Sequence, residues 1–386
     1  MHRAPVRRRS LAVLVACLSA GAPAPGAAKA GRVMLYVGTY TSGESKGIYR
    51  LDLDLATGAL SPASDPTETV NPSFLAFHPS RRFLYAVNET GDAPGDKSGA
   101  VSAFAIDPAT GGLTFLNEQP SGGAAPCHVT IDKEGRHAIV ANYWGGTVAM
   151  LPIQADGRLG PASTVVRHQG RSASPGRPAE PHPHSVNLDA ANRFAFVADL
   201  GLDEVVSYRF DGKKGLLAPH EVGTVRLAPG AGPRHLAFRP DQREAYVINE
   251  LDSTITRLAH DEDAGAMKAL QTVSTLPAGF QGSNSTAEIV VHPDGRLLFG
   301  SNRGHDSIAI FTIDRATGTL TPAGHQPTGG KTPRNFAIDP TGAYLLAANQ
   351  DSDSIAVFRI DRARGRLEPV GNPVRVPRPV CLRMMR

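Results

Sequence analysis

From about residue 33 onward, apolar and polar residues alternate over short stretches separated by turn residues. Residues 83–87 (FLYAV) and 307–311 (SIAIF) are typical: each is rich in β-branched or aromatic residues and too short for a helix. A turn such as Asp314 to Gly318 then follows. No segment keeps a 3.6-residue apolar period, which argues against stacked helical repeats. The pattern therefore predicts an all-β chain.

One strand–turn–strand pattern recurs along the chain. The hexapeptide that begins at His235 (HLAFRP) has counterparts, and the lead residues of the six runs are Phe74, His128, His184, His235, Glu288 and Asn335. Successive leads are 54, 56, 51, 53 and 47 residues apart. A second strand follows each lead and ends in an amide or acid: Asn88, Asn142, Asp199, Asn249, Asn302 and Asn349. Five of these lie 14 residues after their lead and Asp199 lies 15 after. Units of this length hold four strands with tight turns, which is typical of propeller blades.

The two ends of the chain supply the remaining blade. Gly38-Thr39 matches the end of a second strand, but the N-terminal segment occupies the place of its first strand. Residues 378–383 (RPVCLR) look like a lone first strand. We therefore expect residues 378–384 to pair with residues 33–38, which would leave no free sheet edge in the ring. The sequence predicts a seven-bladed β-propeller of four-stranded blades, closed by the C-terminal strand pairing into the N-terminal blade.

Residues 1–30 have the composition of an export signal. Four arginines precede the apolar run at 11–18, which is far too short to span a membrane, and Ala28-Lys29-Ala30 fits a cleavage site. The paired arginines also permit twin-arginine export. Alternatively, residues 14–17 (LVAC) resemble a lipobox, in which case Cys17 would be lipidated and would anchor the chain to a membrane. We predict a signal peptide over 1–30, a single propeller domain over 31–386, and a periplasmic or secreted protein.

Removing the predicted signal changes the charge of the protein. The full chain has 40 basic and 36 acidic side chains; residues 1–30 hold five of the basic and none of the acidic ones, so the remainder has 35 and 36 and a net charge of −1. This balance predicts no nucleic-acid partner. Of the cysteines, Cys127 and Cys381 remain, and they could pair in an oxidising compartment.

Polar side chains should gather at one end of the channel. In a propeller the first strands line the axis, and the loops entering them share a face with the loops after the second strands. Charged and aromatic groups occupy both sets, whereas packing alone would favour small or aliphatic residues. Such a concavity suits a polar or anionic ligand, although a merely water-filled channel would have similar walls. The predicted substrate-binding residues are His128, Tyr143, His182, His235, Glu288, Arg334 and Gln350.

Several motifs resemble one family. Gly38-Thr39-Tyr40-Thr41, the stretches 181–185 (PHPHS) and 232–235 (GPRH), and the stretches 247–251 (VINEL) and 301–307 (SNRGHDS) are similar to the seven-bladed propeller lactonases. That family includes bacterial 6-phosphogluconolactonases and a fungal carboxymuconate-lactonising enzyme. The resemblance extends over about residues 33–383. It implies a small-molecule lactone substrate and an active site of one His, two Arg and one Glu.

By motif, the implied catalytic residues are His184, Arg234, Glu250 and Arg303, with His182 an alternative for the histidine. Hydrolysis of a lactone needs a base to activate water and a positive group for the carbonyl oxyanion. Glu250 or His184 could be the base. Arg234 and Arg303 could hold an oxyanion or a substrate anion. Glu250 could also simply pair with an arginine.

Other chemistries have weaker support. His128, His184 and His235 share a repeat position, but matched acidic or cysteine ligands are missing, so we expect neither a metal nor a cofactor. Two other functions stay open: a non-catalytic small-molecule or scaffold propeller, and a lactonising cycloisomerase of the carboxymuconate type. Because a phosphorylated sugar lactone is a cytosolic metabolite, the predicted export also makes an unphosphorylated aldonolactone a reasonable substrate.

Overall fold

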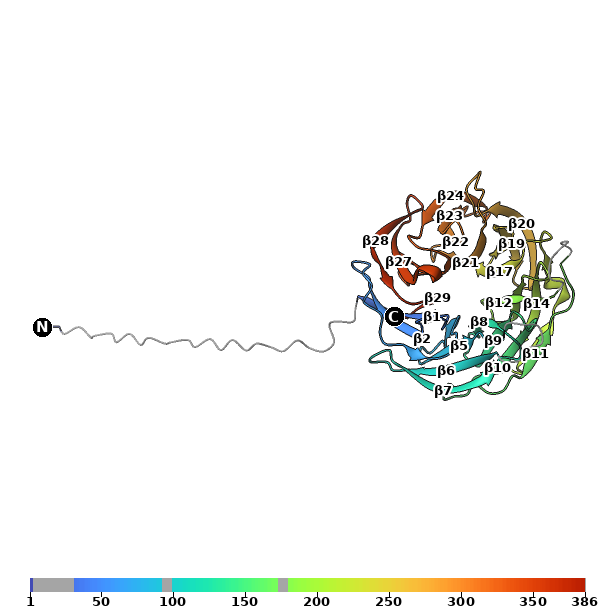
Figure 1. Cartoon of the computed structure of the whole chain (residues 1–386), viewed down its shortest axis with the longest axis horizontal. Helices are drawn as coiled ribbons and strands as arrows, with labels where there is room; N and C mark the ends of the chain where they lie inside the picture. Colours follow the sequence, from blue (N-terminus) through green and yellow to red (C-terminus); the bar gives the residue numbers. More distant parts are fainter. Residues whose placement is uncertain (3–30, 92–98, 173–179, 386) are drawn as a thin grey trace. The chain divides into compact units, whose positions relative to one another are not determined.

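The computed structural model describes residues 1–2, 31–91, 99–172 and 180–385. The predicted signal peptide and lipobox lie almost wholly outside these residues. Within the described residues, no helix is long and apolar enough to cross a membrane. Residues 32–386 form one compact unit, a ring of seven antiparallel sheets around an axis (Figure 1).

Each sheet is a blade whose strands follow one another from the axis outward. The first three blades are β29 (Pro379–Met385), β1 (Arg32–Thr39), β2 (Gly47–Asp54) and β3 (Thr67–Glu68); β4 (Leu75–Phe77), β5 (Phe83–Asn88), β6 (Ala100–Ile106) and β7 (Leu113–Pro120); and β8 (Pro126–Ile131), β9 (His137–Asn142), β10 (Thr147–Pro152) and β11 (Thr164–Arg167). The fourth is β12 (Pro183–Leu188), β13 (Phe194–Asp199), β14 (Glu204–Asp211) and β15 (Leu216–Pro219), with β16 (Val225–Arg226) also on β14 after the 3₁₀ helix η1 (Glu221–Gly223).

The last three blades complete the ring. They are β17 (Pro233–Phe238), β18 (Glu244–Asn249), β19 (Thr254–Asp261) and β20 (Ala266–Ser274); β21 (Ser285–Val291), β22 (Leu297–Arg303), β23 (Ser307–Ile313) and β24 (Leu320–Pro327); and β25 (Pro333–Ile338), β26 (Tyr344–Asn349), β27 (Ser354–Asp361) and β28 (Arg366–Arg375), with the 3₁₀ helix η2 (Gln350–Ser352) after β26. The predicted seven-bladed propeller is confirmed. The fourth blade departs from the predicted four strands, because two short outer strands, β15 and β16, both pair with β14.

The predicted ring closure is also confirmed. The C-terminal strand β29 is the innermost strand of the blade that contains β1, and it pairs with Met34 through Thr39 in antiparallel register (Figure 1). Leu382 lies opposite Val37 and Arg383 opposite Tyr36. Strands from the start and the end of the propeller thus share one sheet, which closes the ring of blades.

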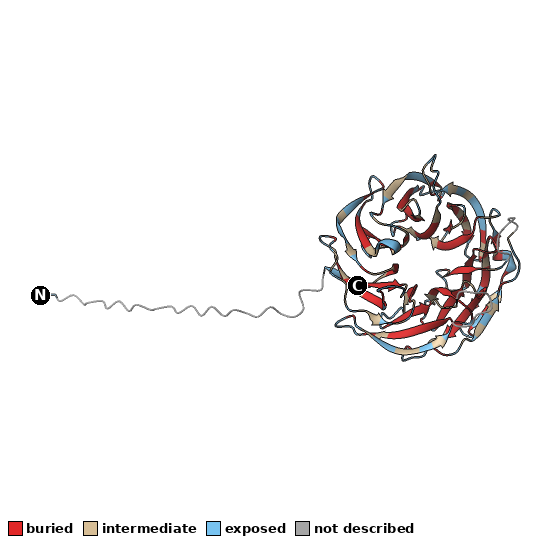
Figure 2. Ribbon diagram, in the orientation of Figure 1, coloured by how far each residue is buried: buried red, intermediate tan, exposed pale blue. Residues whose placement is uncertain are grey.

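The core lies between the blades. The second strands are buried along their whole length, as in β5, β9, β13, β18 and β26, because each is covered by a neighbouring blade on both faces (Figure 2). This explains why those segments are continuous apolar runs rather than alternating ones. The outermost strands, such as β28, expose most of their residues. The two cysteines described, Cys127 and Cys381, are buried and free, so the possible disulfide is not formed.

Irregular pairing at the start of the innermost strands sorts the axial residues into rings. In β17 the register shifts between Pro233, opposite Asn249, and His235, opposite Ile248, so Arg234 is an extra residue. The same shift occurs in β8, β12, β25 and β29. We define ring one as this extra residue of each innermost strand, together with its equivalents in the blades of β4 and β21. Its members are Ser73, Cys127, His184, Arg234, Ala287, Arg334 and Val380. Ring two is Phe74, His128, Ser185, His235, Glu288, Asn335 and Cys381.

This register corrects one sequence-based alignment. Ser185, not His184, lies opposite Ala198 in the way that His128 lies opposite Ala141. His184 is therefore the structural equivalent of Arg234 and Arg334. Aligning His184 with His128 and His235 was wrong by one residue, and this offset is why Asp199 followed its lead by 15 positions.

Candidate active site

Four charged or titratable side chains meet at the end of the axis where the second strands finish. Glu250 accepts a hydrogen bond from Arg234 Nε at 2.8 Å, and its other oxygen is 3.1 Å from Arg303 Nη2. His184 Nε2 is 4.0 Å from the Glu250 carboxylate. The structure thus brings together all four residues that the motifs singled out.

Rigid strand ends hold this cluster. Glu250 directly follows β18, Arg303 ends β22, and His184 and Arg234 belong to ring one. Both arginines are also anchored to the backbone of β21: Arg234 Nη1 donates to the carbonyl of Ala287 and Arg303 Nη2 to that of Thr286, each at 2.7 Å. Arg303 Nε is buried without a hydrogen-bond partner among the described residues. Arg50 Nε and Arg378 Nε are unpaired in the same way elsewhere, so what distinguishes Arg303 is that its unpaired donor belongs to the charged cluster.

The protonation states follow from burial and neighbouring charge. Burial alone would raise the pKa of Glu250, but Arg303 and Arg234 outweigh it and lower the pKa, so the carboxylate is ionised. Burial, reinforced by Arg234, lowers the pKa of His184 well below its usual value, so the imidazole is neutral at pH 7. Burial and the neighbouring guanidinium groups of Arg334 and Arg303 lower the pKa of Arg234 to about 10, so it stays charged.

A third arginine lies in the same region. Arg334, also of ring one, is stacked over the ring of Tyr40 at 5.3 Å, and the Tyr40 hydroxyl donates to the Glu89 carboxylate at 3.0 Å. Burial acts against the charge of Arg334, but the surrounding Tyr40, Glu89 and Glu250 raise its pKa overall. Within the described residues, no carboxylate pairs directly with its guanidinium. Arg334 was predicted to bind substrate; Tyr40 was missed, although it belongs to the GTYT motif.

His182 and Tyr143 form an aromatic wall beside His184. Their rings are stacked 4.5 Å apart, and the Tyr143 ring meets that of His184 edge-on at 5.5 Å. Asp199 holds His182 in place through hydrogen bonds. One of its oxygens accepts the backbone N–H of His182 at 2.8 Å, and the other accepts a hydrogen bond from His168 Nδ1 at 2.7 Å. The equivalent position is an asparagine in five other blades.

Four of the predicted substrate-binding residues lie outside this cluster. Gln350 begins η2 and donates to Asp351. His128, His235 and Glu288 belong to ring two and line a separate cavity further along the axis. His235 links the two levels, because its Nε2 lies 3.2 Å from Arg234 Nη1 while its Nδ1 is 2.9 Å from Glu288.

Two other chemistries have no matching geometry in the described part of the chain. No group of three or more His, Cys, Asp or Glu side chains there could hold a metal ion. Residues 43–47 (GESKG) match the G-x-S-x-G spelling of a serine-hydrolase elbow. Ser45, however, is buried in the connection from β1 to β2, and its hydroxyl is hydrogen-bonded to Thr39 Oγ1 at 2.6 Å. The elbow needs a strand-to-helix turn with the serine exposed, so this match is coincidental.

A groove of about 730 Å³ adjoins Arg303 on the same face. Most of its lining residues carry a hydroxyl, amide or carboxylate group. Its lysine, Lys331, is paired with Asp306 at 2.8 Å. The lining residues are Ser283, Asn284, Ser285, Arg303, Gly304, Asp306, Lys331, Thr332 and Asp351.

Comparisons with known proteins agree with this site. The family model described as "Lactonase, 7-bladed beta-propeller" matches residues 34–384. The chain is 37% identical to a 6-phosphogluconolactonase of Bacillus subtilis over 78% of this chain and 83% of the relative, and 33% identical to one of Formosa agariphila over 78% and 85%. The solved structure of the periplasmic gluconolactonase of Pseudomonas aeruginosa superposes with a TM-score of 0.87 at 36% identity, covering 92% of this chain and 99% of that one.

These findings support lactone hydrolysis, of the 6-phosphogluconolactonase-like kind, as the enzymatic class. The family match extends over nearly the whole described ring. The chain therefore belongs to the seven-bladed β-propeller lactonase family.

Proposed function

We propose that this protein is an exported lactonase that hydrolyses an unphosphorylated sugar lactone, with His184 as general base. The observation that carries the proposal is a neutral imidazole 4.0 Å from a carboxylate that two arginines hold ionised. Both oxygens of Glu250 are already engaged by arginines, whereas the imidazole of His184 is uncharged at pH 7 and can accept a proton. This assigns the two candidate roles: His184 takes the proton, and Glu250 orients the arginines and stabilises the imidazolium.

The proposed reaction starts with water bound beside His184. As the water oxygen attacks the lactone carbonyl, His184 takes its proton and negative charge develops on the carbonyl oxygen. Arg334 and the unpaired Nε–H of Arg303 would stabilise that oxyanion. The tetrahedral intermediate then collapses, the ring C–O bond breaks, and the imidazolium returns its proton to the leaving alkoxide. The products are a hydroxycarboxylic acid, ionised at neutral pH, and the original enzyme.

The groove beside Arg303 supports a neutral, hydroxyl-rich substrate tail. The cations in and beside the described groove already have carboxylate partners: Lys331 pairs with Asp306, Arg378 with Asp351 and Arg303 with Glu250, so a phosphate dianion would gain little there. Serine, threonine and asparagine side chains with these carboxylates instead offer partners for sugar hydroxyls. The similarity to a periplasmic gluconolactonase supports the same choice.

A lactone panel tests the proposal. Acid release should be measured with aldonolactones that carry or lack a 6-phosphate, and loss of muconate absorbance should be followed in parallel. We expect kcat/KM to be higher for the unphosphorylated lactones. A strong preference for the phosphorylated compound would contradict the substrate assignment. No turnover of any lactone would favour a binding propeller, and muconate consumption a cycloisomerase.

Export is the second part of the proposal. It rests on the arginine-rich start and short apolar run of residues 1–30, and on the periplasmic location named for the Pseudomonas relative. Mass spectrometry of natively expressed protein tests it. We expect a mature chain that begins near Gly31, or a lipidated one that begins at Cys17. An intact N-terminus in a cytosolic fraction would contradict export and make the phosphorylated lactone the better substrate.

A further inference from the structure

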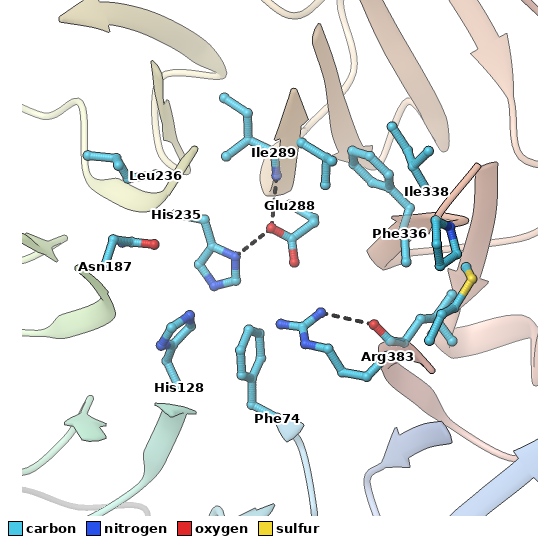
Figure 3. A pocket seen from close by; sticks show the side chains of 15 residues that line it. Phe74, His128, Asn187, His235, Leu236, Glu288, Ile289, Phe336, Ile338 and Arg383 are labelled. Atoms are coloured by element: carbon cyan, nitrogen blue, oxygen red, sulfur yellow. Dashed lines mark hydrogen bonds and ion pairs between the residues drawn. The ribbon is translucent and has the colours of Figure 1, made fainter. Parts of the chain in front are cut away.

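The axial channel has a second cavity, separate from the catalytic cluster. It has a volume of about 340 Å³. The four residues of the charged cluster described above do not line it: His184, Arg234, Glu250 and Arg303. Figure 3 shows the side chains of Phe74, His128, His235, Glu288 and Arg383 converging on it from different blades.

The innermost strands explain why space opens here. Side chains two residues apart in a strand point to the same side, so the next axial ring lies two positions beyond ring two. This ring three is Ala76, Thr130, Asn187, Ala237, Val290, Ala337 and Arg383. All of its side chains but one are short, which leaves the axis unfilled. The exception, Arg383, brings a single cation into that space.

The contacts of Arg383 in the described part of the chain are with uncharged groups. Its Nε donates to the carbonyl of Leu75 at 3.0 Å and its Nη1 to that of Leu382 at 2.9 Å, while its guanidinium carbon lies 4.4 Å from the centre of the Phe74 ring. No carboxylate in the described residues is within ion-pair distance of it. The guanidinium is thus held in place by neutral groups, with Nη2 left over for a ligand.

The carboxylate of Glu288, which also lines this cavity, already accepts several hydrogen bonds. Glu288 accepts hydrogen bonds from His235 Nδ1 at 2.9 Å, from the backbone N–H of Ile289 at 3.0 Å and from the side chain of Asn335. Burial acts against the charge of Glu288, but His235 and, across the cavity, Arg383 lower its pKa, so the carboxylate is ionised and held by fixed donors without a direct ion pair to Arg383. His128 adds a donor: its Nδ1 accepts the N–H of Val186 at 3.4 Å, so the ring proton is on Nε2.

From this geometry we infer that the cavity binds a small monocarboxylate, seated between Arg383 and His128 over the Phe74 edge of the channel. The guanidinium and the neutral imidazole can each donate to one carboxylate oxygen, and because ionised Glu288 already shares the charge of Arg383, the cavity favours one negative charge at most. The site does not depend on lactone hydrolysis, so it would stand even if the proposed function failed. Burial and the proximity of His235 lower the pKa of His128 well below its usual value, so binding should not require an imidazolium.

The test uses ¹³C-acetate as the probe, with acetamide as its uncharged isostere, titrated against the mature protein by NMR at pH 7. Four variants locate the bound probe. R383Q removes the cation, and A337L fills the cavity while leaving Arg383 intact. R303K alters the catalytic cluster instead, and R366Q makes the R383Q charge change on the exposed outer strand β28.

We expect acetate, but not acetamide, to saturate the wild type, and R383Q and A337L each to weaken binding about tenfold or more. R366Q and R303K should bind as the wild type does. A soaked crystal should show acetate beside Arg383. The inference is overturned if acetate fails to saturate the wild type, if acetamide binds equally well, or if R303K rather than R383Q and A337L abolishes binding. If R383Q misfolds, A337L decides the matter alone.

Discussion

Replacing Glu250 by Gln should separate catalysis from stability most clearly. The change keeps the shape of the side chain but removes the only carboxylate that touches both Arg234 and Arg303 among the described residues. An amide can accept from one arginine only, and its NH₂ then faces the other. Three guanidinium groups would remain, with Glu89 as the nearby acid. The developing imidazolium on His184 would lose its neighbour as well.

The magnitudes follow from burial. Removing one partner of a buried ion pair costs about 3–5 kcal/mol; since 19% of the Glu250 side chain is exposed, about 2–3 kcal/mol is the better expectation. For a domain of this size that is a fall of roughly 3–6 °C in Tm. The loss of charge stabilisation in the transition state should lower kcat/KM by about 10²- to 10³-fold.

A matched control lies at the start of β18, the strand that Glu250 follows. Glu244 and Arg257 form a bidentate pair at 2.8 and 2.9 Å, with 11% and 12% of their side chains exposed, away from the axis. Glu244→Gln should therefore lower Tm by a similar amount but leave kcat/KM within about twofold. Lactone hydrolysis followed by acid release, together with calorimetry, measures both. If Glu250→Gln keeps nearly full kcat/KM while its Tm falls like that of the control, Glu250 is purely structural.

The other predictions concern protonation, binding, positioning and closure. Because burial and Arg234 lower the pKa of His184, kcat/KM should stay constant from about pH 8 to below about 6.5 and fall only when the imidazole protonates; an acid limb centred above about pH 7 would contradict its role as base. Arg303→Lys keeps the charge but loses the Nε–H that is proposed to stabilise the oxyanion, so kcat should fall about 10²-fold; an unchanged kcat would remove Arg303 from oxyanion stabilisation. Asp199→Asn restores the residue that five other blades carry, and should raise KM several-fold by loosening His182; the same KM as wild type would make the Asp199–His168 pair irrelevant to the site. Deleting residues 378–386 should lower Tm sharply; a truncated protein that stays fully soluble with an unchanged Tm would disprove the closure argument.

The repeat made the architecture predictable, because blades of similar length leave few alternatives once their number and the spare C-terminal strand are counted. It also predicted the meeting of Glu250, Arg234 and Arg303, since residues at equivalent ends of consecutive blades must be neighbours. The division of the axis into separate rings was not predictable. A β-bulge adds one residue without a distinctive sequence mark, so His184 was aligned with ring two although it belongs to ring one. Tyr40 was missed for a related reason: its blade is split between the two ends of the chain, which hid its repeat position.

The closing strand and the catalytic cluster are joined by one line of hydrogen bonds. Arg234 can only donate, so its contact with His235 Nε2 leaves that nitrogen the acceptor and puts the ring proton on Nδ1, facing Glu288. Glu288 in turn accepts from Asn335, whose oxygen accepts the backbone N–H of Leu382 in β29 at 2.8 Å. Every partner in this line has a fixed donor or acceptor role, so the orientation of Arg234 depends on β29 being in place. Loss of the C-terminal strand should therefore reduce kcat/KM even in whatever fraction of the truncated chain remains folded, a result that loss of ring stability alone would not produce.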